Sequence, residues 1–116
     1  MTDVTTRPDL TGRHGAGAMT GISSVHANVL DLIGNTPMVD VSNLSPNPNV
    51  RIIAKLEMQN PFGSVKDRIA RAMIEAAEAD GSLLPGQTII EPSSGNTGIA
   101  MAMICGIKGY RIKIVL

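Results

Sequence analysis

A lysine stands at the start of an expected helix, in the segment NPFGSVKDR at residues 60–68. Lys66 follows Gly63 and Ser64, a pair that is typical of a turn. The positive end of a helix macrodipole disfavours a second positive charge, so this position favours a neutral amine. A neutral amine can attack a carbonyl group and form a Schiff base. The alternative is an ordinary solvated lysine, and the rest of the chain has to decide between them.

A second segment whose side chains could bind a ligand is EPSSGNTG, at residues 91–98. It lies where a short apolar stretch meets a helical pattern. Four of its side chains carry hydroxyl or amide groups: Ser93, Ser94, Asn96 and Thr97. Such a loop at a helix start, with free N–H groups, suits a carboxylate or a phosphate. Capping by Ser94 or Asn96 is the alternative, but it explains one polar residue rather than four. The segment is neither a P-loop nor a dinucleotide-binding fingerprint.

Hydrophobic periodicity predicts the elements that position these two turns. Strands are expected near residues 38–41, 51–57, 88–92 and 110–116, and helices near 23–33, 64–80 and 97–108. Ser23 or Ser24 would cap the first helix, and Gly34 would end it. Strands that alternate with helices predict an α/β fold with a parallel sheet. In such sheets ligands bind at the carboxyl ends of the strands, where both turns are expected to lie.

The helix near residues 64–80 should be amphipathic. Its expected buried stripe comprises Val65, Ile69, Ala70, Met73, Ile74 and Ala77, and its expected solvent side comprises Arg68, Arg71, Glu75 and Glu78. The helix near residues 97–108 is apolar nearly all round, which predicts packing on several sides. Cys105 lies within it and is expected to be a buried, unreactive thiol.

Composition excludes several classes of function. The 116 residues carry ten acidic and ten basic side chains and only two aromatic ones, Phe62 and Tyr110. We therefore expect no nucleic-acid partner and no membrane partner. With one cysteine, no intramolecular disulfide can form, which favours a reducing compartment such as the cytoplasm. His14 and His26 are far apart in the sequence, so we expect no metal site.

Taken together, NPFGSVKDR and EPSSGNTG resemble the fold type II family of pyridoxal-phosphate enzymes. Cysteine synthase (O-acetylserine sulfhydrylase) and cystathionine β-synthase are the most similar members. The resemblance runs from about residue 30 to residue 116 and includes the segments IGNTP, AKLE and KGYR. It implies a three-layer α/β fold with a parallel sheet. Residues 1–22 are interpreted as a flexible leader and residues 23–116 as the incomplete amino-terminal part of such an enzyme.

The resemblance also implies roles for individual residues. Lys66 would bond covalently to pyridoxal phosphate and later transfer a proton. Asn96 would donate a hydrogen bond to the ring hydroxyl of the cofactor. Ser93, Ser94, Asn96 and Thr97 would bind the carboxylate of a small amino-acid substrate. The resemblance gives Asp67 and Arg68 a structural role only.

The reaction implied is β-replacement. An O-acetylserine-like substrate would lose its leaving group to give an aminoacrylate, and a sulfur donor would add to it to form cysteine. Condensation of serine with homocysteine is an alternative within the same family. Serine and threonine dehydratases fit less well, because their motif usually has Phe where this chain has Val65.

The family's phosphate-binding cup and the residue facing the pyridine nitrogen have no counterpart in these 116 residues. The chain is therefore expected to be inactive alone and to belong to a longer, homodimeric protein. An inactive remnant that only pairs with a full-length homologue is the alternative outside enzymology.

Overall fold

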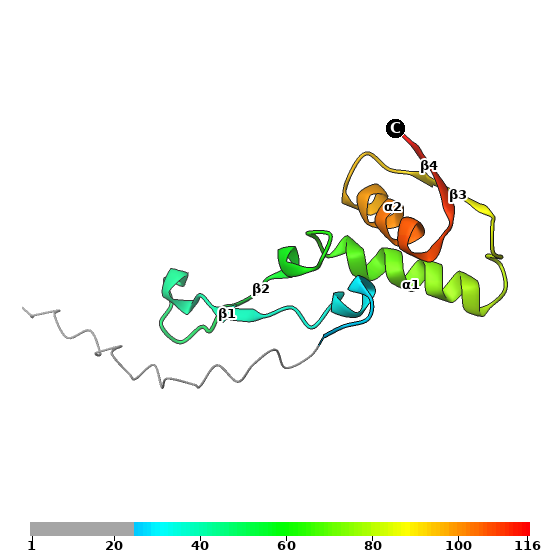
Figure 1. The fold of residues 1–116 in the computed structure, drawn as a ribbon. Coiled ribbons are helices and arrows are strands. Elements are labelled where there is room, and N and C mark those ends of the chain that lie inside the picture. The colour runs from blue at the N-terminus through cyan, green and yellow to red at the C-terminus, as the bar shows by residue number, and fades with distance from the viewer. Residues whose placement is uncertain (1–24) are drawn as a thin grey trace, which may run out of the picture.

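The computed structural model describes residues 25–116 (Figure 1). The predicted leader and the predicted caps Ser23 and Ser24 lie outside these residues. The 3-10 helices are η1 (Val29–Leu32), η2 (Ser42–Leu44) and η3 (Glu57–Gln59). The strands are β1 (Met38–Asp40), β2 (Ile53–Lys55), β3 (Thr88–Pro92) and β4 (Arg111–Val115). The α-helices are α1 (Lys66–Ala79) and α2 (Asn96–Lys108).

The first predicted helix is much shorter than the apolar pattern suggested. Only η1 forms within residues 25–33, and it is a single 3-10 turn. Its cap is Asn28, whose side chain accepts a hydrogen bond from the backbone N–H of Leu30 at 2.9 Å. Leu30 is buried, whereas Val29 and Leu32 remain exposed. With one buried apolar side chain, the segment has too little packing to extend a helix beyond its nucleus.

Strands β3 and β4 form the predicted parallel pair. Their register runs from Thr88 opposite Arg111 to Pro92 opposite Val115, and α2 makes the crossover between them. A parallel pair needs a crossover of this length, and helices commonly supply it. Both strands have the bounds that their short apolar runs predict, to within one residue. This part of the molecule confirms the α/β class.

The two earlier strands do not join that sheet. Strand β2 pairs antiparallel with β1, with Met38 opposite Lys55 and Asp40 opposite Ile53, and the two form a separate ribbon. Among the described residues, the expected parallel sheet therefore comprises only β3 and β4. The loop between β1 and β2 returns the chain alongside β1, so the nearest available partner is local in sequence. In Figure 1 the ribbon lies on one side of α1, away from β3 and β4.

The core lies where α1 packs against α2 and α2 packs against β3 and β4 (Figure 1). Its buried side chains are Leu30, Ala70, Ile74, Ala100, Met101, Ile104 and Cys105. All are small or aliphatic, as the scarcity of aromatic residues predicts. Burial raises the pKa of the Cys105 thiol, which agrees with the expected unreactive cysteine. No helix in the described part of the chain is long and apolar enough to cross a membrane.

The predicted faces of α1 are only partly correct. Ala70 and Ile74 are buried against α2, whereas Val65, Ile69 and Met73 are 40–50% exposed. Helix α2 packs against α1 and against β3 and β4, as its apolar pattern predicts, but Ile99 and Met103 remain about half exposed. These side chains belong to the outer parts of each apolar stripe, which the described elements cover only in part.

The charged residues on the expected solvent side of α1 are partly exposed, and they form ion pairs and hydrogen bonds. Arg68 pairs with Glu57 and Arg71 with Glu75, both at 2.8 Å. Glu78 accepts from Lys108 at 2.7 Å and from the Tyr110 hydroxyl at 2.9 Å. These bonds lower the pKa of Glu78 and tie the end of α1 to the end of α2. Periodicity identifies the polar face of a helix but not the partners that other elements bring to it.

Candidate functional site

Lys66 is the first residue of α1, and the turn before it has a defined geometry. The N–H of Gly63 donates to the carbonyl of Asn60 at 2.9 Å. Gly63 has a φ of +89°, a conformation that glycine adopts without the steric cost paid by other residues. The Ser64 hydroxyl accepts from the backbone N–H of Lys66 at 3.1 Å. The sequence Gly-Ser thus builds a turn that delivers Lys66 to the helix start.

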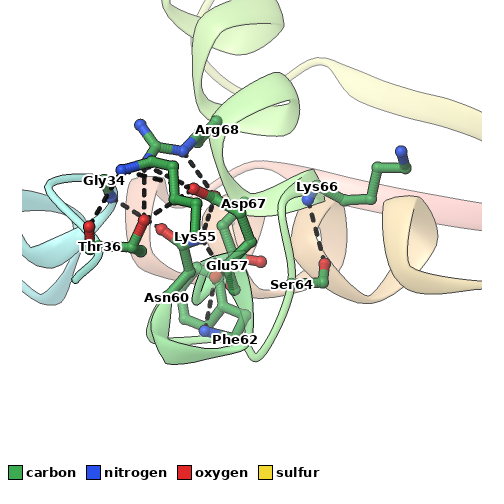
Figure 2. Close-up of polar contacts among 10 residues, drawn as sticks. All are labelled: Gly34, Thr36, Lys55, Glu57, Asn60, Phe62, Ser64, Lys66, Asp67 and Arg68. Atoms are coloured by element: carbon green, nitrogen blue, oxygen red, sulfur yellow. Dashed lines mark hydrogen bonds and ion pairs between the residues drawn. The ribbon is translucent and has the colours of Figure 1, made fainter. Parts of the chain in front are cut away.

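Two buried polar side chains hold this turn at its ends. The Asn60 side chain, 3% exposed, accepts from the Gly34 N–H at 2.8 Å and donates to the Glu57 carbonyl at 2.8 Å. Asp67 is fully buried, and its Oδ2 accepts from the Phe62 N–H at 2.6 Å (Figure 2). Buried polar groups are normally satisfied in this way, and charge-assisted bonds are the stronger ones.

Glu57, in η3, is the centre of a second set of contacts. Its carboxylate accepts two bonds from the Arg68 guanidinium, at 2.8 and 3.1 Å, and one from the Thr36 hydroxyl at 2.7 Å. Asn60 donates to the same carboxylate at 2.9 Å. The bonds from Arg68, then Thr36 and Asn60, hold the pKa of Glu57 at about 2. This cluster joins the β1–β2 ribbon to the start of α1.

The side chain of Lys66 lies apart from that cluster. In Figure 2, Asp67 and Arg68 are on the side of Glu57, whereas Lys66 extends in the opposite direction. Neighbouring helical residues differ by about 100° around the axis, which accounts for the separation. Lys66 is partly buried, and its amine has no hydrogen-bond or ion-pair partner among residues 25–116. The chain therefore braces the backbone of this lysine and leaves its amine available.

The second predicted segment forms the loop between β3 and α2. Ser93 has a role in the loop itself: its hydroxyl accepts from the N–H groups of Gly98 at 2.9 Å and Gly95 at 3.3 Å. Gly95 is at the cap position of α2 and supplies no side chain. Capping by Ser94 or Asn96 is therefore not found, and Ser93 satisfies the helix start instead. A Cβ on Gly98 would lie only 3.2–3.3 Å from atoms of Ser93, so a larger residue there would force Ser93 to shift.

The other three predicted residues of this loop are unengaged. The side chains of Ser94, Asn96 and Thr97 have no hydrogen-bond partner within the described residues; Ser94 and Asn96 are exposed and Thr97 is partly buried. A cavity of about 270 Å³ lies beside the loop, lined by Ser93 to Gly95 and by apolar side chains of α2 and β4. Unpaired hydroxyl and amide groups next to a hollow can serve a ligand.

The two helices begin on the same side of the molecule. Figure 1 shows the starts of α1 and α2 facing one way, and the two helices pack against each other. The structure thus brings the two predicted turns to one side, but no hydrogen bond joins Lys66 to the Ser93–Thr97 loop among the described residues. The largest cavity described, about 570 Å³, lies between α1 and β3 and is lined by none of the predicted site residues.

Sequence reasoning missed the residues that support the lysine turn. Thr36 and Glu57 lie in segments noted only for the family resemblance. Asn60, Asp67 and Arg68 lie in the lysine segment, but the sequence assigned them no specific contact. One signal was present: Glu57 and Arg68 carry opposite charges in segments that flank the same turn. That signal does not reveal which partners are buried together, because burial depends on the path of the intervening loop.

Comparison with known proteins gives consistent results. The family model described as pyridoxal-phosphate dependent enzyme matches residues 29–116. A cysteine synthase of Staphylococcus aureus is 54% identical over 84 residues, covering 72% of this chain and 27% of the relative. A cystathionine beta-synthase of Saccharomyces cerevisiae is 53% identical over 92 residues, covering 77% of this chain and 18% of the relative.

Solved structures show the same likeness. An O-ureido-L-serine synthase superposes with a TM-score of 0.73 at 44% identity, covering 78% of this chain and 28% of that one. A hydrogen sulfide-producing enzyme from Fusobacterium nucleatum gives a TM-score of 0.74 at 50% identity, covering 80% and 30%. The chain thus spans less than a third of the length of these relatives. Because the family model covers most of the sequence, this chain belongs to the family of pyridoxal-phosphate-dependent enzymes.

Proposed function

We propose that this chain supplies the lysine and the substrate-carboxylate loop of an enzyme that makes cysteine by β-replacement on an O-acetylserine-like substrate. The observation that carries the proposal is the unpaired amine of Lys66 at the start of a braced helix. Lys108, by contrast, pairs with Glu78 at 2.7 Å. The similarity to a cysteine synthase supports the choice of reaction.

The residues present fit pyridoxal phosphate. Lys66 offers an amine to an aldehyde, and Asn96 offers an unpaired amide to a ring hydroxyl at the start of α2. When bound, the cofactor supplies an electron-withdrawing ring that stabilises negative charge on the substrate. Residues outside this chain's described part would complete the binding of the phosphate and the pyridine nitrogen.

The protein's own groups have separable tasks. Ser94, Asn96 and Thr97 would bind the substrate α-carboxylate, aided by N–H groups at the start of α2. Ser93 would contribute to the same binding by shaping the loop, since its hydroxyl already accepts from Gly98. Lys66 would hold and move the proton at the substrate α-carbon through its Nζ atom.

The wider setting forms part of the proposal. The whole protein would act as a homodimer on a small amino acid and a sulfur donor. A reducing, cytoplasmic location agrees with a single buried thiol, Cys105. Condensation of serine with homocysteine is the second candidate, and the 53% identity to a cystathionine beta-synthase favours it specifically. A product assay on a full-length protein carrying this segment, comparing sulfide with homocysteine, separates the two.

The first experiment tests Lys66 directly. The purified chain is mixed with pyridoxal phosphate, the visible absorption of the lysine adduct is recorded, and the adduct is reduced with borohydride. Peptide mass spectrometry then locates the label. We expect the label at Lys66 and its loss in Lys66→Ala, because the amine of Lys66 is unpaired among the described residues and extends from the start of α1, beside the turn that fixes its backbone.

Lys113→Ala is the matched control, since Lys113 lies exposed on β4. Its removal should leave the absorption band unchanged. Label spread evenly over Lys55, Lys108 and Lys113 would contradict the proposal and favour an inactive remnant that acts only by pairing with a full-length homologue.

A further inference from the structure

We infer that Asp67 is a positioning residue, which fixes the backbone of Lys66 by holding the turn from Phe62 to Asp67 closed. This inference rests on the proposed function, because it concerns the reactivity of the Lys66 amine. Asp67 is the buried residue directly after Lys66, and no part of its side chain is exposed. A fully buried carboxylate is rare unless its partners compensate the loss of hydration.

One carboxylate oxygen of Asp67 has a strong partner. Its Oδ2 accepts from the Phe62 N–H at 2.6 Å, a short bond to a charged acceptor (Figure 2). This bond joins the residue after the lysine to the residue four positions before it. The closed segment contains Gly63 with its positive φ and Ser64, which receives the Lys66 N–H at 3.1 Å. Lys66 is therefore held at its own N–H and at the next residue.

The side-chain bond of Asp67 adds to two backbone bonds in this turn, from the Gly63 N–H to the Asn60 carbonyl at 2.9 Å and from the Asp67 N–H to the Ser64 carbonyl at 3.3 Å. Glycine has the largest conformational freedom of any residue, so a turn through Gly63 opens readily without an external constraint. Packing does not hold Gly63 in place either. Apart from its chain neighbours, no heavy atom lies within 4 Å of the point that a Cβ would occupy at this residue. Asn60 anchors the beginning of the turn through Gly34, and Asp67 anchors its end. Loss of the Asp67 side chain would remove the one side-chain bond that joins the Phe62 N–H to the half of the turn that carries Lys66.

The second carboxylate oxygen of Asp67 gives further support to the inference. Oδ1 is buried and has no hydrogen-bond partner among the described residues. An unsatisfied buried acceptor costs stability, so a carboxylate chosen only for stability would be better replaced there by a smaller or neutral group. The side chain of Lys66 points to the opposite side in Figure 2, so Asp67 acts on it through the backbone. A purely structural acid at a helix start would change stability alone.

The test compares Asp67→Ala with Asp67→Asn in the whole chain. Asn keeps an oxygen that can accept from the Phe62 N–H, whereas Ala removes the acceptor. The rate of acetylation of Lys66 by acetic anhydride is measured relative to that of exposed Lys113, at a temperature where circular dichroism shows each variant folded. Exchange of the Phe62 amide hydrogen is followed in parallel. In Asp67→Ala we expect the Lys66-to-Lys113 ratio to change by roughly fivefold and Phe62 exchange to accelerate similarly, as loss of one hydrogen bond predicts.

In Asp67→Asn both quantities should stay close to those of the unsubstituted chain. If the ratio of the Lys66 and Lys113 acetylation rates is unchanged in folded Asp67→Ala, the inference is wrong. It is also wrong if the ratio changes equally in both variants, because the charge of Asp67 would then matter rather than its oxygen acceptor. If Asp67→Ala does not fold, an ester in place of the 61–62 peptide bond removes the same N–H, and the same ratio decides. The labelling experiment with pyridoxal phosphate on the unsubstituted chain tests the proposed function alone. Failure of the proposed function would appear there, whereas failure of the Asp67 inference would appear only in the comparison of the Asp67 variants.

Discussion

The two turns that precede α1 and α2 are built in opposite ways. The lysine turn has buried polar side chains at both ends, Asn60 and Asp67, and the Glu57 cluster beside it. The loop before α2 has one engaged side chain, Ser93, and leaves Ser94 and Asn96 exposed. One turn is therefore fixed by the protein itself, whereas the other keeps most of its polar groups for a partner.

This difference matches what the two turns are proposed to do. A nucleophilic amine has to be presented in one direction, and rigid support reduces the cost of holding it there. A loop that binds a carboxylate gains from unpaired hydroxyl and amide groups, and local segments with few contacts open at low free energy. The same element type, a strand or turn leading into a helix, thus serves two tasks through its neighbours rather than through its own geometry.

The largest effect should come from weakening the scaffold that both turns share. Ile104 is fully buried in α2, between α1 and the β3–β4 pair. Ile104→Ala is expected to lower the free energy of unfolding by about 2–5 kcal/mol, because it leaves a cavity in the core. Urea unfolding measures the loss. Hydrogen exchange should then accelerate in both turns together.

The control for that variant is Ile99→Ala, since Ile99 lies on the same helix but is 54% exposed. It should change the free energy of unfolding far less. Equal losses in the two variants would mean that α2 is not packed against α1 through Ile104.

The next effect is a pH dependence of stability that arises from Glu57, beside the lysine turn. The bonds from Arg68, Thr36 and Asn60 lower the pKa of Glu57 from 4.5 to about 2 in the folded chain. A lowered pKa contributes stability that is complete above pH 4.5 and is lost as the pH falls towards 2. We therefore expect Glu57→Gln to be less stable than the unsubstituted chain at pH 7 and to show a flatter loss of stability below pH 4.5.

Urea unfolding at several pH values measures both slopes, and protection of the Phe62 amide reports the lysine turn separately. Asp80→Asn is a suitable control, because the pKa of Asp80 is also lowered, by Ser82, but this residue lies at the far end of α1. Parallel acid profiles for the unsubstituted chain and Glu57→Gln would show that the Glu57 cluster does not stabilise the folded state.

A smaller effect should be confined to the loop before α2. Gly98→Ala places a Cβ 3.2–3.3 Å from the Ser93 side chain and carbonyl. Overpacking costs about 1–3 kcal/mol, and the better helix propensity of Ala returns about 1 kcal/mol. The net loss should be about 1 kcal/mol, with amide chemical shifts changing at residues 93–98 and staying unchanged at Phe62. Changes that spread to the lysine turn would contradict the independence of the two regions.

Local patterns predicted most of the second half of the chain. The bounds of β3, α2 and β4 follow from short apolar runs ended by Pro92 and Gly109, and these signals are contained in the sequence itself. The β1–β2 ribbon could not be predicted in the same way, because three-residue strands choose partners by tertiary contact rather than by pattern. The candidate site residues were proposed from their types. Their supports were not, because a hydrogen bond such as that from Gly34 to Asn60 joins residues that no periodicity relates.

The smallest effect distinguishes two neighbouring serines in the loop before α2. Ser93→Ala removes the acceptor for the Gly98 N–H and should cost about 1 kcal/mol, in the range for loss of a helix cap. Ser94→Ala should change stability by less than about 0.5 kcal/mol, because its exposed hydroxyl has no partner among the described residues. Thermal unfolding of the two variants measures the difference. A larger loss for Ser94→Ala would mean that the loop is fixed through Ser94. The loop before α2 would then be held by its own side chains, as the lysine turn is, and the contrast between the two turns would be wrong.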